Sequence, residues 1–360
     1  MPLPRLNSLL ARGASMARAV AVLATLALLP FAPPAAAQTK ETLRVLAWPG
    51  YADTDLVRVF ERRYGVHVEI TLVDSDDALW DRLRANRGAD FDVFAANTAE
   101  LRRIIDEGLA QPLDLALISN VSRQLPRFRD LSSLPGVVRR GQVYAIPYTY
   151  AEMGLIYDRK LVPEAPTSLN ALWDPRFQGR VLAYNGSSHN FSLAAMSLGS
   201  KTPFRIAPAE TRKMIERLVA LRRNVRTFYT SPEESVELFR ENRVALMFAN
   251  YGVQQLQLLQ KAGLDVGYVI PREGALAWLD CWAITRGARN RRLAEQWINY
   301  TLEEPVSTAL TERQGLANTL HEPAHLAEGA RLFWLEPVED AERRAALWRR
   351  IIAGDPPERF

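Results

Sequence analysis

One carboxylate interrupts an apolar stretch late in the chain, where residues 274–284 have the sequence GALAWLDCWAI. The stretch is rich in apolar and aromatic residues, which is typical of a buried strand. Because strand side chains alternate between faces, Asp280 shares one face with Trp278 and Trp282, while Cys281 lies on the other. Burying an unpaired carboxylate is costly. Asp280 therefore needs a cation, either an arginine of this chain or a group that a ligand supplies.

The indole rings beside Asp280 suit a ligand cation. An ammonium group over an aromatic face gains roughly 0.5–2 kcal/mol, so Trp278 and Trp282 are suited to form a cage around an ammonium group. A salt bridge to an arginine of the chain is the structural alternative. For Cys281, the only cysteine, we expect a small buried hydrophobic side chain rather than a nucleophile.

The composition indicates an ordinary globular protein. The chain has 360 residues, of which 48% are hydrophobic and 24% are charged, and its net charge is +4. This length suffices for two domains. So small a net charge, without a basic run that interleaves aromatic residues, gives no case for a nucleic-acid partner. A single cysteine excludes an internal disulfide, so stability must come from a large core.

The N-terminal 37 residues predict a secretory signal peptide. Three arginines precede an apolar stretch at 19–31, and the small residues before Gln38 form a cleavage pattern, so we expect cleavage near Ala37. A membrane anchor is the alternative, but it needs about 20 apolar residues, and this run is shorter and broken by prolines. No cysteine follows the run, so a lipid anchor is unsupported.

Strands and helices alternate after the signal peptide. This alternation predicts a parallel sheet with helices on both faces, and ligands of such sheets bind beyond the carboxyl ends of the strands. Trp48, Asn97 and Thr98 occupy those ends, and Tyr51 lies in the turn after the first strand. The expected strands are 43–48, 66–73 and 91–96, and the expected helices begin at Asp53, Asp77 and Thr98.

A second α/β pattern begins after an irregular stretch at 111–142. We expect strands at 143–148 and 154–157 separated by a break, with the first crossing between lobes near Pro147. The strand 181–184 ends at Tyr184 and leads through a short polar turn into a helix. Further expected strands are 244–248 and 266–270, and further helices are 168–173, 187–198, 209–222, 232–241, 250–262, 291–302, 305–313 and 340–352.

Residues 321–325, with the sequence HEPAH, match the H-E-x-x-H zinc motif. That chemistry needs both histidines on one face of a helix. Pro323 lies between them, and a proline inside a helix costs about 3 kcal/mol. We therefore predict no metalloprotease site, no metal and no cofactor.

Several short motifs, in their order and spacing, resemble the periplasmic substrate-binding proteins of polyamine ABC transporters, the spermidine/putrescine-binding group. The resemblance covers essentially the whole chain after the signal peptide. The motifs are LAWPGY at 46–51, FDV at 91–93 followed by EG at 107–108, IPY at 146–148, SLNALWDP at 168–175 with Gly179, and EGALAWLD at 273–280.

The resemblance implies a type II two-lobe periplasmic-binding-protein fold, an α/β fold in which each lobe is a mostly parallel sheet flanked by helices. Crossover hinge strands would join lobe 1, residues 41–146 and 279–322, to lobe 2, residues 147–278 and 323–360. It also implies a monomer in the periplasm that is not an enzyme. Such a protein closes on a small amine between its lobes and delivers it to an inner-membrane ABC permease.

Within this resemblance, Trp48 and Tyr51 match aromatic residues of the first lobe, and Trp278 with Asp280 matches an aromatic-plus-acid pair. The expected ligand-binding residues are Trp48, Tyr51, Asn97, Thr98, Tyr184, Ser187, Tyr251, Trp278 and Asp280, with Glu152, Asn185 and His189 as further candidates.

The chain departs from the family at the other end of the expected ligand. Residues 185–189, with the sequence NGSSH, replace acids, and Ala99, Ala249 and Leu316 stand where aromatic residues are usual. One ammonium site therefore looks intact and the other dismantled. Glu152 is a possible replacement acid, with a hinge salt bridge as its structural alternative. The Ser187-Ser188 turn could hold an anion at a helix N-terminus or only cap that helix.

Three other functions stay open. A zwitterionic ligand, with its amine on Asp280 and its carboxylate at Ser187, is a variant of the amine-ligand hypothesis. A secreted hydrolase or transferase would need a nucleophile beside His189 or Glu152, and the sequence supplies none. A receptor that senses its ligand without transport has the same binding residues, and the fold alone does not exclude it.

Overall fold

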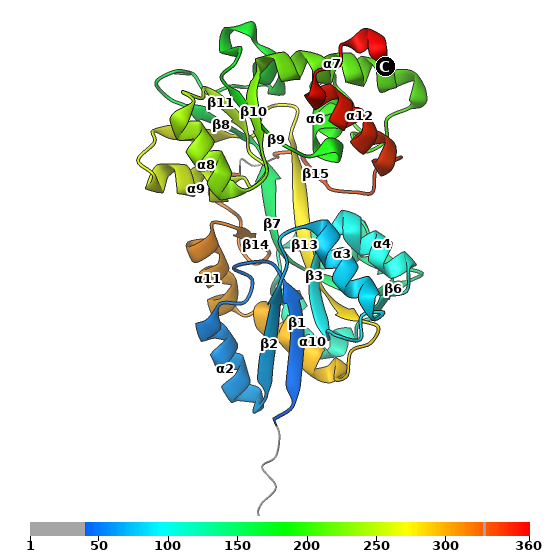
Figure 1. Cartoon of the computed structure of the whole chain (residues 1–360). Coiled ribbons are helices and arrows are strands. Elements are labelled where there is room, and N and C mark those ends of the chain that lie inside the picture. The colour runs from blue at the N-terminus through cyan, green and yellow to red at the C-terminus, as the bar shows by residue number, and fades with distance from the viewer. Residues whose placement is uncertain (1–39, 327–328) are drawn as a thin grey trace, which may run out of the picture. The chain divides into compact units, whose positions relative to one another are not determined.

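The computed structural model describes residues 40–326 and 329–360. The predicted signal peptide lies outside the described residues. Within them, no helix has both the length and the apolar character needed to cross a membrane. Two mixed sheets, one of eight strands and one of five, carry the fold (Figure 1).

The larger sheet has the strand order β14-β7-β13-β3-β1-β2, and β4 and β15 also pair with β13. Its β1–β2 and β1–β3 pairs are parallel, as the alternation of strands and helices predicts, whereas β13 runs antiparallel to β3 and β7. Its strands are β1 (Thr42–Ala47), β2 (His67–Leu72), β3 (Val93–Asn97), β4 (Ala110–Gln111), β7 (Ala145–Met153), β13 (Ala275–Thr285), β14 (Ala317–Asn318) and β15 (Leu332–Trp334).

The helices around this sheet lie close to their expected positions (Figure 1). They are α2 (Thr54–Tyr64), α3 (Asp76–Ala85), α4 (Thr98–Asp106), α10 (Arg291–Thr301) and α11 (Glu304–Gln314). Gly65 ends α2 with a φ of 69°, a left-handed conformation that glycine adopts without strain. The stretch expected to be irregular folds into short 3-10 helices, Leu115–Leu117, Ser119–Arg123 and Leu131–Ser133, the short helix α5 (Pro126–Arg129) and the hairpin of β5 (Val138–Arg139) and β6 (Gln142–Val143).

The smaller sheet has the order β10-β9-β11-β8-β12. Strands β10, β9 and β11 are parallel, and β8 and β12 add antiparallel pairs. Its strands are β8 (Leu155–Asp158), β9 (Val181–Tyr184), β10 (Val225–Tyr229), β11 (Leu246–Phe248) and β12 (Val266–Val269), and the helices beside them are α6 (Ser187–Ser197), α7 (Thr211–Asn224), α8 (Pro232–Glu241), α9 (Val253–Lys261) and α12 (Ala341–Ala353). Further 3-10 helices are Leu169–Trp173, Pro175–Phe177, Pro208–Glu210 and Pro357–Arg359.

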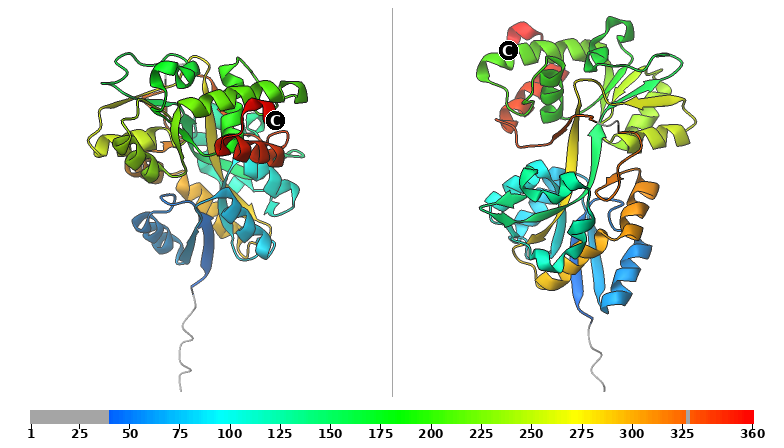
Figure 2. Two further views of the ribbon diagram at one scale, coloured as in Figure 1. Left: turned by 45° about the horizontal axis from the view of Figure 1, so that its top comes forward. Right: turned by 180° about the vertical axis from the view of Figure 1, so that it is seen from behind.

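Strands β7 and β13 run side by side from the larger sheet toward the smaller one (Figures 1 and 2). The predicted break at 149–153 is wrong, because β7 is one continuous, fully buried strand of nine residues. It pairs with β13 on one side and with β14 on the other, so both edges of its backbone gain hydrogen bonds. Only Gly154 separates β7 from β8, the first strand of the smaller sheet.

Separate hydrophobic clusters stabilise the two sheets. The cluster of the larger sheet includes Trp282 and Trp297, whose ring centroids are 6.1 Å apart, and Phe60 packs edge-on against Trp297. Trp282 is 0% exposed and also contacts the ring of Tyr148. The prediction that Trp282 forms part of an ammonium cage is therefore wrong, because aromatic side chains of the core cover its ring.

Candidate ligand-binding site

Asp280 is buried on β13 and is bound by Tyr51. The Tyr51 hydroxyl donates a hydrogen bond of 2.6 Å to Asp280 Oδ2, and Tyr51 and Asp280 are 4% and 6% exposed, respectively. Among the described residues, no arginine or lysine pairs with Asp280. Burial raises the pKa of Asp280 to about 7, and the Tyr51 hydrogen bond lowers it only in part. The arginine alternative is thus not what the structure has.

Tyr51 is held in place by the core beneath the site. Its ring packs edge-on against Tyr148 and Trp282, at centroid distances of 5.6 and 6.3 Å. Burial, followed by the charge of Asp280, raises the pKa of Tyr51 well above its usual value, so its hydroxyl stays a donor. Cys281 is 0% exposed and burial raises its pKa, as expected of a packing residue rather than a nucleophile.

A second carboxylate, Asp76, lies beside the same strand. In the antiparallel pairing of β13 with β3, Asn97 is the partner of Asp280, which places their Cβ atoms about 5 Å apart. Asn97 Nδ2 donates a 3.0 Å hydrogen bond to Asp76 Oδ1, and its Oδ1 caps α4 by accepting from the amides of Ala99 and Glu100. Asn97 therefore links the start of α3, the start of α4 and β13.

The pKa of Asp76 is also raised to about 7. Protein atoms crowd the carboxylate, and the charges of Glu100, Asp280 and Asp77 then repel its ionised form. Asp76 as a whole residue is exposed, so a solute can reach it although protein atoms surround its carboxylate. The Ser75-Asp76-Asp77 sequence is typical of a solvated helix start, and the contact with Asn97 was not predicted.

Tyr184, at the end of β9, is the residue of the smaller sheet that lies near Asp76. After burial, the charge of Asp76 is the next cause that raises the pKa of Tyr184, so the two side chains lie within electrostatic range. The Tyr184 ring meets those of Tyr251 and His189 edge-on, at centroid distances of 6.0 and 5.3 Å. Burial lowers the pKa of His189 to about 4, so this imidazole is neutral at neutral pH.

Trp278, on β13, makes a hydrogen bond to the segment that follows β11 of the smaller sheet. Its Nε1 donates a 3.1 Å hydrogen bond to the carbonyl of Asn250, the residue before Tyr251, and its half-buried ring packs against the clusters of both sheets. Trp278 shares a strand face with Asp280. We call these seven residues the site ring; strand pairing, hydrogen bonds, a ring contact and chain adjacency connect them, and Asp76 and Tyr184 lie within electrostatic range of each other: Asp280, Asn97, Asp76, Tyr184, Tyr251, Asn250 and Trp278.

Other predicted site residues have structural contacts instead. The hydroxyl of Thr98 donates to the carbonyl of Leu335 at 2.6 Å, and Thr98 is 0% exposed. Asn185 Oδ1 accepts from Trp348 Nε1 at 2.9 Å. Trp48 is half-buried against the larger core, and its Nε1 has no hydrogen-bond partner in the described part of the chain. Ser187 opens α6 after Gly186, which provides no side-chain cap.

Glu152 pairs with His325 rather than with the site ring. Glu152 is 1% exposed, and its Oε2 lies 3.0 Å from His325 Nε2. His321 contacts a different acid, Glu304. Residues 321–325 are not helical, so the two histidines do not converge, and within the described residues no group of three or more His, Cys, Asp or Glu is arranged to hold a metal.

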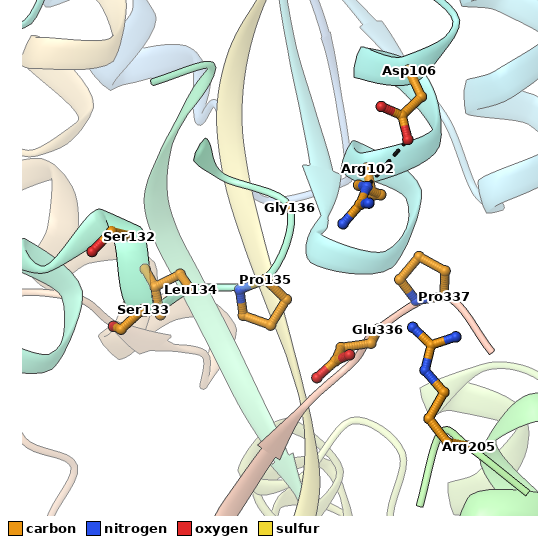
Figure 3. Close-up of a pocket in the computed structure, with 10 residues that line it drawn as sticks. All are labelled: Arg102, Asp106, Ser132, Ser133, Leu134, Pro135, Gly136, Arg205, Glu336 and Pro337. Carbon is orange, nitrogen blue, oxygen red and sulfur yellow. Dashed lines mark hydrogen bonds and ion pairs between the residues drawn. The ribbon is translucent and has the colours of Figure 1, made fainter. Parts of the chain in front are cut away.

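Two surface cavities lie away from Asp280. One, of about 430 Å³, lies between α4 and the segment after β15, where Arg102 binds Asp106 and faces Arg205 and Glu336 (Figure 3). The other, of about 540 Å³, is lined by Arg84, Arg87, Glu107, Gly108, Leu109 and Arg286. Neither contains a residue of the site ring.

The sequence matches one protein family over most of its length. The family described as bacterial extracellular solute-binding protein matches residues 55–330. The spermidine/putrescine-binding periplasmic protein 1 of Haemophilus influenzae is 25% identical over 281 residues, which cover 77% of this chain and 75% of that protein. The putrescine-binding periplasmic protein PotF of Escherichia coli is 27% identical over 300 residues, with coverage of 78% and 79%.

Solved structures support the fold. The spermidine/putrescine transporter substrate-binding protein PotD of Streptococcus pneumoniae superposes with a TM-score of 0.73 at 22% identity, covering 86% of this chain and 98% of that one. The PotD lipoprotein of Treponema pallidum gives a TM-score of 0.74 at 19% identity, with coverage of 86% and 99%. The expected type II two-lobe fold is therefore confirmed.

Proposed function

The chain belongs to the family of bacterial extracellular solute-binding proteins, and from that premise we propose that it binds a polyamine or a related small amine for an ABC transporter. The relatives named above are periplasmic proteins named for spermidine and putrescine. We extend the ligand class, the periplasmic location and the delivery to an inner-membrane permease from them to this protein.

The observation that carries the proposal is the state of Asp280. Its carboxylate is 6% exposed, it has a tyrosine hydroxyl as its hydrogen-bond donor, and it has no cationic partner in the described part of the chain. A buried carboxylate is stabilised far more by a charge than by a neutral donor. An ammonium group of a ligand would supply the positive charge that the described part of the chain does not place beside Asp280.

The aromatic residues of the site ring suit the rest of such a ligand. Tyr184, Tyr251 and Trp278 are half-buried, so each has ring surface that a ligand can cover. Methylene groups of an alkyl amine bury apolar area against these rings, at about 25 cal/mol per Å². We assign Trp48, which is also half-buried, to the same surface on the side of the larger sheet, and we assign to Tyr51 the role of binding Asp280 through its hydroxyl.

We propose that the two sheets are the centres of two lobes, with residues 41–146 and 279–322 in one and 147–278 and 323–360 in the other. The separate hydrophobic clusters and the passage of β7 and β13 between the sheets support this division. The ligand would bind where the site ring joins the lobes, and the protein would act as a monomer.

Binding, rather than catalysis, is the activity that these residues support. The buried thiol of Cys281 has a raised pKa, which disfavours its thiolate. Glu152 is paired with His325, and neutral His189 packs on Tyr184. A nucleophile with an adjacent base, which a hydrolase or transferase needs, is therefore absent from the candidate residues.

Isothermal titration calorimetry with a panel of solutes tests this function. The panel contains putrescine, spermidine, γ-aminobutyrate and choline, with succinate, which has no ammonium group, as a control. We expect the diamines to bind and succinate not to bind. Tighter binding of γ-aminobutyrate than of putrescine would favour the zwitterion alternative, with its carboxylate at Ser187, and binding of no amine would refute the proposal.

A further inference from the structure

Asp76 and Asp280 lie close together although 204 positions separate them in the sequence. They are connected through Asn97, which is the strand partner of Asp280 and donates to Asp76 at 3.0 Å. The charge of Asp280 is among the causes that raise the pKa of Asp76, so the two carboxylates lie within electrostatic range. Two acids at one place leave an excess of negative charge that this part of the chain does not neutralise.

Unpartnered acceptors accompany this pair. Asp280 Oδ1 has no hydrogen-bond donor in the described part of the chain, although the residue is only 6% exposed. Asn250 is 5% exposed, and its Oδ1 is buried without a partner while its backbone carbonyl accepts from Trp278. A buried acceptor without a donor costs about 1–3 kcal/mol, so Asn250 Oδ1 would gain from a donor supplied from outside the chain. Asp280 Oδ1 is not fully buried, so such a donor can reach it.

The oxygens around the ring are complementary to one kind of chemical group. A primary ammonium carries three N–H donors on one positively charged nitrogen. Asp280, Asp76 and Asn250 offer acceptors from β13, from the start of α3 and from the end of β11. A quaternary ammonium has no N–H group, so it gains only the electrostatic and aromatic contributions.

We propose that Asp76 is a second acid of the amine site, and that it and Asp280 hold one primary ammonium group of the ligand between them. This inference rests on the proposed function and names its specificity: a primary amine rather than a quaternary one. Asn97 is a positioning residue, because its amide fixes Asp76 while its oxygen caps α4.

The charge balance of the pair has a measurable consequence. Both carboxyl groups have pKa values raised to about 7, so near neutral pH the empty pair retains a proton part of the time. An arriving ammonium group stabilises the ionised carboxylates. The displaced proton passes to the buffer, so binding near pH 7 releases protons.

Asp77 provides a matched control. It is the next residue of α3, it is exposed as Asp76 is, and, unlike Asp76, it has no side-chain partner among the described residues. Asp76→Asn and Asp77→Asn remove the same charge from the same first turn, so their effects on the helix dipole are alike. Only Asp76 contacts Asn97.

The experiment measures putrescine binding by calorimetry at pH 7 for the wild type, Asp76→Asn and Asp77→Asn, in two buffers of different ionisation enthalpy. We expect Asp76→Asn to weaken binding about tenfold or more and Asp77→Asn about twofold or less, because the proposed ligand would cover Asp76 and not Asp77, and a charged pair that the ligand desolvates loses this much when one partner is removed. Proton release should fall more in Asp76→Asn than in Asp77→Asn, which removes only one of the charges that raise the pKa of Asp76. The preference for putrescine over its fully N-methylated analogue should shrink in the same variant.

The possible outcomes separate this inference from the proposed function. If the wild type binds putrescine and Asp76→Asn behaves as Asp77→Asn does, Asp76 is not part of the amine site, but the proposed function stands. If the wild type binds no amine of the panel, both proposals fail. Equal affinity of the wild type for putrescine and its methylated analogue would also overturn the two-acid arrangement.

Discussion

The hydroxyl of Tyr51 donates a 2.6 Å hydrogen bond to Oδ2 of Asp280, across 229 positions of sequence. This bond joins the turn after β1 to the middle of β13. It gives the buried carboxylate one neutral donor and leaves its other oxygen without one in the described structure. The site is thus preorganised but lacks a positive charge, and this underlies the predictions below.

Replacing Asp280 by Asn should weaken the binding of putrescine or spermidine about tenfold or more, because a buried charge pair that loses one partner costs about 2–5 kcal/mol. Calorimetry at pH 7.5 measures the effect. Asp265→Asn, which removes a carboxylate from an exposed ion pair with Arg159, is the control and should bind as the wild type does. An unchanged affinity in Asp280→Asn would remove the central residue of the proposed site.

Replacing Tyr51 by Phe removes the single hydroxyl donor of Asp280 and keeps the ring in the core. We expect the free energy of unfolding to fall by about 1–3 kcal/mol, the cost of leaving a buried acceptor without its donor. Urea denaturation measures it. Tyr148→Phe is the comparison, because the Tyr148 hydroxyl makes only a 3.4 Å contact with the Tyr51 carbonyl, and its loss should cost less. Equal losses would mean that the bond to Asp280 contributes nothing specific.

The contribution of Asp280 to the free energy of unfolding of the ligand-free protein should decrease as the pH rises toward 7. The pKa of Asp280 in the folded protein lies at about 7, above its usual value of 3.8, so between these values the folded protein holds a proton that the unfolded chain has lost. The groups within hydrogen-bond or electrostatic range of the two site acids are Tyr51, Cys281, Asn97, Asp77, Glu100 and Tyr184.

Comparing the wild type with Asp280→Asn at pH 5 and pH 8 isolates this contribution. Raising the pH should destabilise the wild type relative to the variant by about 2–3 kcal/mol. Affinity for a diamine should change the other way and increase from pH 5.5 to pH 8 in the wild type, because the ionised carboxylate is the form that binds the ammonium. A pH dependence that is the same in both proteins would contradict the raised pKa.

Glu152→Gln should affect stability more than binding. Glu152 is 1% exposed and binds His325, which connects β7 to the segment after β14. Losing this contact should lower the free energy of unfolding by about 1–3 kcal/mol, while affinity for putrescine should fall less than in Asp280→Asn. Thermal denaturation and calorimetry on the same preparation measure both. An affinity loss equal to that of Asp280→Asn would instead make Glu152 a ligand-binding acid.

Local sequence patterns predicted the buried position of Asp280, but they did not predict which aromatic side chains pack on the neighbouring Trp282. Strand alternation correctly separates Cys281 from Asp280, and the apolar run predicts burial. Alternation also places Trp282 on the face of Asp280, yet Tyr148 and Trp297 cover that ring. These partners come from β7 and α10, and periodicity within one strand carries no information about them.

Asp76 was missed for a related reason. A serine followed by two acids is the usual start of a helix, and Ser75 does cap α3. Only the position of β3 beside β13 brings Asn97, and through it Asp76, to Asp280. The continuity of β7 was mispredicted because Thr149 and Glu152 are polar in the sequence, whereas both are buried in a strand that pairs with β13 along its length and with β14 at Thr149.

The sole sulfhydryl of the chain lies next to Asp280, on the opposite face of β13, with none of its surface exposed. Its reaction with a thiol reagent must wait for the strand to separate from its neighbours. The rate at which a thiol reagent labels Cys281 therefore reports how often β13 opens, without any engineered probe. A solute that binds the adjacent carboxylate and stabilises the strand should lower this labelling rate in proportion to its occupancy.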